Sequence, residues 1–298
     1  MTTTFKLAPL TALALSITAC DGATGPADAA VADARVEADA SPAIDGGPSE
    51  FPSLDNTGIP DGACPDGLTP AGPEAERPES GSTFECVLFA DFLPYIPDSV
   101  SNVTYRYCRF ETSSADSFIN LQGGPVLIED SELVGGAGTW IRASYEAHGL
   151  TVRRSELAGM ANAVEWGTND VVLEGNLVHD FGNVEDGQHA DGFQCDGVER
   201  FVIRNNTVLM GLDTWGATSA LLVSGTDSIV EGNLLGGAGY TIHVAGDLQV
   251  TGNRVTTMFS ERSGEYGPVY PEALDATGTW EDNACYDGPN AGVAIDAP

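Results

Sequence analysis

A short segment recurs about every 20 to 30 residues through most of this chain, and no other feature constrains the fold as strongly. Each copy has two apolar positions separated by one residue, then a charged residue, a turn residue, and finally Asn or Ser. Six copies read VLIEDS (126–131), LTVRRS (150–155), VVLEGN (171–176), FVIRNN (201–206), SIVEGN (228–233) and LQVTGN (248–253), with VTYRYC (103–108) and GTWEDN (278–283) at the two ends. Because the pattern never takes a helical period, it predicts an all-β solenoid whose strands stack about 4.8 Å apart in successive coils.

Two columns of the repeat support this register. The residue after the apolar pair alternates in charge from coil to coil, as Arg106, Glu129, Arg153, Glu174, Arg204 and Glu231. Directly stacked opposite charges attract and like charges repel, so we expect an exposed Arg/Glu ladder. We expect the final Asn column to be structural, because Asn tolerates left-handed backbone angles and its amide can bond the equivalent Asn in the next coil.

A second strand recurs in the same coils, as FINLQ (118–122), TWIRA (139–143), NAVEW (162–166), DGFQC (191–195), SALLV (219–223) and YTIHV (240–244). Its alternation turns Cys195 into the core, where we expect a buried, unpaired thiol. One outward row then contains Asn120, Arg142, Glu165, Gln194, Leu222 and His243. The row two residues earlier contains small residues beside Trp140, which we expect to form an aromatic wall. Such a face suits an extended sugar chain, although Arg142 and Glu165 could equally be solvated sheet residues.

The segments before the repeats have a different composition. Residues 1–19 resemble a signal peptide, with Lys6 followed by an apolar stretch too short to span a membrane. The sequence ITAC ending at Cys20 resembles a bacterial lipobox and predicts lipidation of Cys20. Residues 20–60, rich in Ala, Asp, Gly and Pro, predict a disordered tether. We expect a cap region at 61–97, the solenoid at 98–290 and a tail at 291–298.

Charge and cysteine content narrow the function further. The chain has 12 Lys+Arg against 44 Asp+Glu, and no lysine follows Lys6. This excess of acidic groups argues against nucleic-acid binding and restricts membrane contact to the lipid on Cys20. Of the cysteine pairs, Cys64–Cys86 is our first choice for a disulfide, whereas Cys108 and Cys285 should lie too many coils apart to bond.

Together these features resemble the right-handed parallel β-helix proteins of the pectate-lyase-like superfamily. The resemblance covers roughly residues 98–290 and predicts about seven to eight coils, with Phe84 to Tyr95 acting as an N-terminal cap. The stretch NTGIPDG (56–62) is similar to the start of many secreted members. The superfamily includes lyases, hydrolases, epimerases and proteins with no known activity, so the resemblance alone gives the fold and leaves the chemistry open.

Candidate chemistry gathers in the longer coils. HADGFQ (189–194) resembles an H-x-D-G-[hydrophobic]-Q run of secreted β-helix proteins, in which it lies where a strand lining the groove begins. We expect His189 to act as base or acid and Asp191 as its orienting or metal-binding partner. An alternative is that both residues only anchor a loop. Asp180 and Asp186 could bind calcium, but their spacing does not reproduce the pectate-lyase motif.

Insertions add aromatic side chains that could stack on sugars. Trp215 lies in one long coil, and Tyr266 and Tyr270 lie in another. Each could equally form the small hydrophobic core of its own loop. In the carbohydrate interpretation, Arg142 would neutralise a uronate carboxylate, and Glu165, Gln194, Trp215 and His243 would line the site.

The sequence therefore predicts a monomeric, lipid-anchored protein outside the cytoplasm that recognises a polysaccharide. It could also cleave that polysaccharide, as a lyase or a glycoside hydrolase acting on an acidic or neutral glycan. The alternative is a non-catalytic surface, structural or adhesive protein. An enzyme would need several of Arg142, Glu165, His189, Asp191 and Gln194 around one pocket.

Overall fold

The computed structural model describes residues 51–90, 92–112, 119–135, 138–182, 189–212, 216–271 and 277–298. The predicted signal peptide, Cys20, most of the predicted tether, Asp186 and Trp215 lie outside these residues. No helix in the described ranges is long and apolar enough to cross a membrane.

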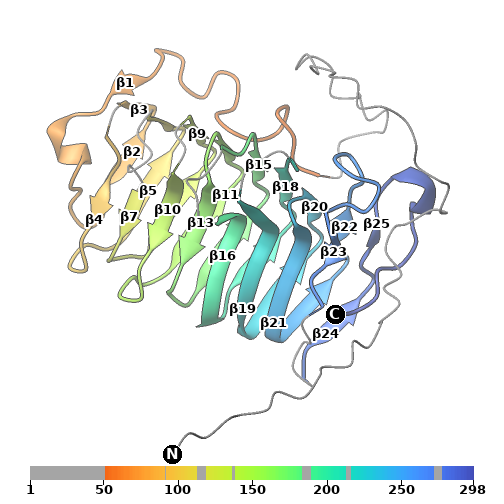
Figure 1. The fold of residues 1–298 in the computed structure, drawn as a ribbon. Coiled ribbons are helices and arrows are strands. Elements are labelled where there is room, and N and C mark those ends of the chain that lie inside the picture. Colours follow the sequence, from red (N-terminus) through yellow and green to blue (C-terminus); the bar gives the residue numbers. More distant parts are fainter. Residues whose placement is uncertain are drawn as a thin grey trace, which may run out of the picture.

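The described chain forms a parallel β-solenoid of about 7 turns, as the repeat predicted (Figure 1). A typical coil has three strands, for example β10 (Thr139–Ala143), β11 (Leu150–Arg153) and β12 (Glu156–Ala158). Each strand pairs in parallel with its copies in the neighbouring coils. The three stacks of strands define three faces, which we call face 1, face 2 and face 3 in the order of β10, β11 and β12.

Face 1 contains β10 and the strands β4 (Tyr95–Ile96), β7 (Ile119–Leu121), β13 (Asn162–Trp166), β23 (Gly267–Val269) and the first parts of β16 (Ala190–Glu199), β19 (Ala217–Glu231) and β21 (Tyr240–Thr251). The long strands β19 and β21 continue into face 2. Face 2 also contains β2 (Thr83–Glu85), β5 (Val103–Arg106), β8 (Val126–Glu129), β11, β14 (Val171–Glu174), β17 (Val202–Arg204) and β24 (Thr279–Glu281).

Face 3 is a separate sheet of ten strands. It contains β12 and β1 (Thr69–Pro70), β3 (Val87–Ala90), β6 (Arg109–Glu111), β9 (Glu132–Val134), β15 (Leu177–His179), β18 (Thr207–Met210), β20 (Leu234–Gly237), β22 (Arg254–Val255) and β25 (Ala284–Cys285). Two short 3-10 turns, η1 (Pro73–Ala75) and η2 (Gly288–Asn290), complete the described elements.

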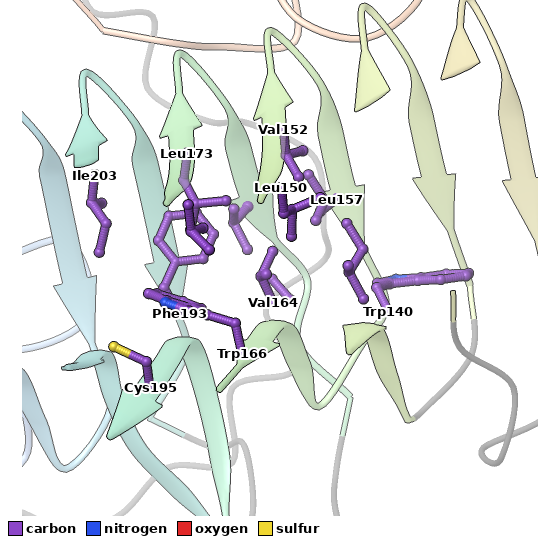
Figure 2. Close-up of a cluster of buried hydrophobic side chains, with 14 of the residues drawn as sticks. Trp140, Leu150, Val152, Leu157, Val164, Trp166, Leu173, Phe193, Cys195 and Ile203 are labelled. Carbon is purple, nitrogen blue, oxygen red and sulfur yellow. The ribbon is translucent and has the colours of Figure 1, made fainter. Parts of the chain in front are cut away.

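The core lies inside the coils and is built by alternation along each strand. Ile141, Val152 and Leu157 come from the three faces of one coil, and all are fully buried. Figure 2 shows such side chains stacked along the solenoid between the sheets. The predicted inward positions of the second strand are all buried, including Cys195.

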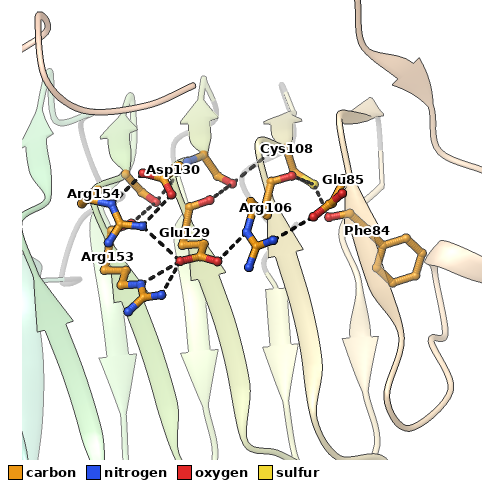
Figure 3. A network of polar contacts seen from close by, with 10 residues as sticks. Phe84, Glu85, Arg106, Cys108, Glu129, Asp130, Arg153 and Arg154 are labelled. Atoms are coloured by element: carbon orange, nitrogen blue, oxygen red, sulfur yellow. Dashed lines mark hydrogen bonds and ion pairs between the residues drawn. The ribbon is translucent and has the colours of Figure 1, made fainter. Parts of the chain in front are cut away.

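The Arg/Glu ladder on face 2 is confirmed (Figure 3). Glu129 receives hydrogen bonds from Arg106 at 2.6 Å and from Arg153 at 2.5 Å, and Arg154 lies 3.1 Å away. Our expectation that the ladder is exposed is wrong for Glu129, which these arginines cover to 2% exposure. Burial raises the pKa of Glu129, but the hydrogen bonds from Arg106 and Arg153 outweigh burial and leave the pKa below its usual value.

The Asn column is confirmed as a structural stack between faces 2 and 3. The Nδ2 of Asn176 donates to Oδ1 of Asn206 at 3.0 Å, and Asn206, Asn233, Asn253 and Asn283 repeat the contact. The left-handed backbone angle lies one residue earlier than expected, for example at Asn205 with a φ of 52°. The column residues point inward, so their amides complete the backbone hydrogen bonds of the turn.

The ends of the solenoid differ from the prediction. Strands β2, β3 and β4 pair with the next coil, so Phe84 to Tyr95 belongs to the solenoid itself, which therefore begins before residue 98. The predicted tether is also too long. The ring of the buried Phe51 packs on that of Tyr286 with centroids 5.5 Å apart, and the backbone N–H of Gly58 donates to the carbonyl oxygen of Arg154. At the other end the side chain of Ile295 is buried, and its carbonyl oxygen accepts a hydrogen bond from Nε1 of Trp280. The predicted tail therefore closes the core.

The predicted disulfide is present. Cys64 and Cys86 form this bond, which joins the N-terminal segment to the first coil. Cys108 and Cys195 are free and buried. Cys108 follows β5 and Cys285 lies in β25, near opposite ends of the solenoid.

Candidate functional site

The outward row of face 1 exists as predicted. Strand register places Arg142 beside Asn120 on one side and beside Glu165 on the other. The row continues through Gln194 and Leu222 to His243. Parallel pairing thus brings side chains that are far apart in sequence into one line across the coils.

Arg142 and Glu165 neutralise one another within this row. The guanidinium Nη2 of Arg142 donates to Oε2 of Glu165 at 2.8 Å, and both side chains are partly exposed. The pair therefore offers a ligand a neutral, hydrogen-bonding surface. Neither residue presents an isolated charge.

The predicted aromatic wall is wrong, because Trp140 lies inside the solenoid. Its side chain is 2% exposed, and its Nε1 donates to the carbonyl of Ala158 at 3.1 Å. Figure 2 shows the ring among the core side chains. Where the chain turns from face 3 into face 1, two successive residues, such as Trp140 and Ile141, both point inward. Strict alternation starts only after this corner.

Gly192 occupies the equivalent corner of another coil. A Cβ at this position would lie 2.2 Å from the carbonyl oxygen of Ala220 and 2.6 Å from Cγ1 of Val208. The interior of the solenoid therefore requires glycine here.

Asp191 is buried at the edge of face 1 and acts on the backbone. Its Oδ1 accepts from the backbone N–H of Ser219 at 3.0 Å, and its own N–H donates to Oδ1 of Asn162 at 2.7 Å. This is the interaction made by the stacked asparagines at the other corner. The expected pairing with His189 is wrong, because the exposed His189 bonds Oγ1 of Thr218 through Nδ1 at 2.7 Å.

The second oxygen of the Asp191 carboxyl, Oδ2, has no hydrogen-bond partner among the described residues. Burial raises the pKa of Asp191 to about 7, opposed by the hydrogen bond from Ser219 and reinforced by Glu165. Since the side chain is fully buried, it cannot exchange a proton with a ligand on the outer surface. Its position agrees with the loop-anchoring alternative.

The calcium expectation receives no support from Asp180. Oδ2 of Asp180 lies 2.8 Å from Nδ1 of His179, whose Nε2 lies 3.1 Å from Oε1 of Glu156. Burial lowers the pKa of His179, but the two carboxylates outweigh burial and raise it. Across the described ranges, no three His, Cys, Asp or Glu side chains are grouped to hold a metal ion.

An aromatic cluster that the repeat pattern did not reveal lies at the C-terminal end of the row. It consists of Tyr240, His243, Tyr266 and Tyr270. The ring of Tyr270 stacks on His243 with centroids 4.2 Å apart and meets Tyr240 edge-on at 5.3 Å. Tyr266 lies 5.6 Å from Tyr240. Tyr266 is 60% exposed and Tyr270 38% exposed, so both rings pack on face 1 while presenting surface to solvent.

The sequence contained one usable signal for this cluster. Tyr240 and His243 lie on one predicted strand, and Tyr266 and Tyr270 belong to the insertion that follows. The sequence does not predict that this insertion returns to face 1 as β23, which pairs with β21. This pairing places the rings of Tyr266 and Tyr270 against the partly exposed Tyr240 and His243 of face 1, so they are not packed only within their own loop.

At the corner between face 1 and face 2, a hollow of about 530 Å³ is lined by residues that include Tyr145, His148, Asp170 and Arg200. Tyr145 is 82% exposed there and has no aromatic neighbour within the described ranges.

Comparisons with protein-family models, with curated protein sequences and with solved structures found no match to this chain. Function must therefore be inferred from the geometry of face 1. The row and the aromatic cluster form one continuous outward surface, since Tyr270 stacks on the last residue of the row.

Proposed function

We propose that face 1 binds an extended carbohydrate chain and that the protein recognises this polysaccharide without cleaving it. The observation that carries the proposal is the exposed aromatic cluster at the end of a polar row. Tyrosine rings offer an apolar face that can cover one side of a sugar ring, and their hydroxyls can hydrogen-bond its edge. The row supplies further donors and acceptors from coils stacked about 4.8 Å apart, except in the coil of Leu222.

The geometry favours binding over catalysis. Hydrolysis of a glycosidic bond commonly needs two carboxyl groups that flank the bond, about 5 to 10 Å apart. On the described part of face 1, Glu165 is engaged by Arg142 and Asp191 is sealed in the interior. His189 is exposed, but its ring bonds a hydroxyl, and no carboxylate of the described residues orients it. This favours a non-catalytic surface protein whose specific role is carbohydrate recognition.

The resemblance to the right-handed, pectate-lyase-like β-helix proteins supports a role outside the cytoplasm. We propose that residues 1–19 are removed, that Cys20 is lipidated, and that the following acidic segment links the anchor to the solenoid. Metabolic labelling with a fatty acid should mark the chain, and Cys20→Ala should lose the label. Label retained in that variant would contradict the anchor.

Substitution of the aromatic cluster tests the binding proposal. Tyr270→Ala and Tyr266→Ala should each weaken binding to a polysaccharide by about tenfold, because each removes a ring face that a sugar would cover. Affinity electrophoresis against a panel of soluble polysaccharides measures the change. Tyr145→Ala is the matched control, since it removes an even more exposed tyrosine from another surface. Equal effects of all three substitutions would contradict the assignment to face 1.

A further inference from the structure

We infer that the glycan bound by face 1 is neutral, such as a hexose or pentose polymer, rather than a polyuronate. This inference rests on the proposed function and deepens it. It replaces the expectation from sequence that Arg142 neutralises a uronate carboxylate. It depends on where the positive charges of the molecule lie and on what already holds them.

Face 1 offers a carboxylate ligand no arginine outside an ion pair within its described strands. Within its described strands the single arginine is Arg142, whose guanidinium bonds Glu165 through both Nε and Nη2. A uronate that took over this guanidinium would leave Glu165 unpaired beside a second carboxylate. Both carboxylates would lose hydration on binding, which is unfavourable without a compensating cation.

The other arginines of the coils lie on faces 2 and 3 or at the corners of the solenoid, and they are also paired. Each forms an ion pair with an Asp or Glu, as do Arg106, Arg109, Arg153, Arg154, Arg200, Arg204 and Arg254. Near the ends of face 1, Arg77 lies over the ring of Tyr95 at 5.9 Å, and Arg262 shares its loop with Glu261 and Glu265. The arginines that form these ion pairs are thus engaged by the protein's own carboxylates, and Arg77 contacts an aromatic ring.

The surroundings of the row are acidic. Asp196 lies exposed on β16, and its Oδ1 accepts a hydrogen bond from Ser224 at 2.7 Å. The whole chain carries a formal charge of -32 at pH 7. A field of this sign repels a polyanion during approach and leaves a neutral chain unaffected.

What face 1 does offer is uncharged hydrogen bonding. Asn120, Gln122 and Gln194 are half-buried amides, and Gln122 accepts from the hydroxyl of Tyr95 at 2.5 Å. Amides both donate and accept, which matches sugar hydroxyls. Tyrosine rings beside amides therefore fit a ligand whose polar groups are hydroxyls.

The test compares the full chain on neutral polymers (mixed-linkage β-glucan, galactomannan, arabinoxylan) and on polyuronates (polygalacturonate, alginate) by affinity electrophoresis. Measurements are made at about pH 8. Each is made in about 0.05 M and about 0.5 M salt, since screening acts on charged ligands alone. We expect at least one neutral polymer to retain the protein, and salt should not change this retention. Binding to that polymer should be about tenfold weaker in Tyr270→Ala. Polyuronates should not retain the protein.

Two results would contradict these statements separately. The first result is retention by a polyuronate alone that is weakened by salt. If this retention were lost in Arg142→Gln and kept in the face 2 control Arg204→Gln, it would overturn the neutral-glycan inference and leave carbohydrate binding intact. Retention by no polymer of either class would overturn the proposed function itself, and with it this inference.

Discussion

The buried carboxyl of Asp191 shows how one side chain can be interpreted in two ways from sequence. In HADGFQ it resembles a residue that lines a groove. In the structure it bonds the backbone of the next coil, as the stacked asparagines do. This role uses only Oδ1, and the second carboxyl oxygen, Oδ2, has no hydrogen-bond partner among the described residues.

We predict that Asp191→Asn stabilises the protein above neutral pH. The pKa of Asp191 is raised in the folded state to about 7 from a usual value of 3.8. Folding therefore favours the protonated form, so the stability of the native protein falls as pH rises from about 4 to about 7. Asn cannot ionise, and the variant should exceed the native protein by a few kcal/mol at pH 8 and match it near pH 4.

Thermal unfolding of both proteins between pH 4 and pH 8 measures this difference. Asp196→Asn is the control, because Asp196 lies exposed on the same strand. An Asp191→Asn protein that is less stable than the native protein at pH 8 would contradict the prediction that ionisation of Asp191 destabilises the fold.

At the scale of the strand, alternation made most of the fold predictable. Outward charges could be assigned because opposite charges recur at one position of the repeat, and the pairing of Arg106, Glu129 and Arg153 follows that order. The corners were not predictable in the same way. A turn between two faces can bury two successive residues, so the sequence pattern placed Trp140 on the wrong side of the sheet.

We predict that Glu129→Gln destabilises the protein by about 1 to 3 kcal/mol, because it removes the charge from a buried acceptor and leaves its arginines uncompensated. Glu174→Gln, a more exposed ladder position paired with Arg204, should cost less than about 1 kcal/mol. Since the pKa of Glu129 is lowered, its stabilising effect is present above its usual pKa and is lost as pH falls through the lowered value.

Urea unfolding at pH 7 in low salt compares the two glutamine variants. Equal losses of stability in Glu129→Gln and Glu174→Gln would show that burial of Glu129 contributes nothing to the ladder.

At the scale of the whole molecule, stacking decides what the surface offers. The outward row of face 1 could be listed from sequence, because its register follows from the repeat. The aromatic cluster could not, since it depends on an insertion that returns to pair with β21. The same limit applied to residues 51–60, whose composition resembles a tether although Phe51 packs against Tyr286. Non-periodic segments contribute contacts that no repeat predicts.

The most direct test of carbohydrate binding by face 1 is a crystal structure of the protein with a neutral oligosaccharide cut from a polymer that it retains. We predict that a sugar ring lies against Tyr270 or Tyr266 and that the chain extends along face 1 toward Gln194. An oligosaccharide found instead in the hollow around Tyr145, or on face 2 or face 3, would contradict this assignment.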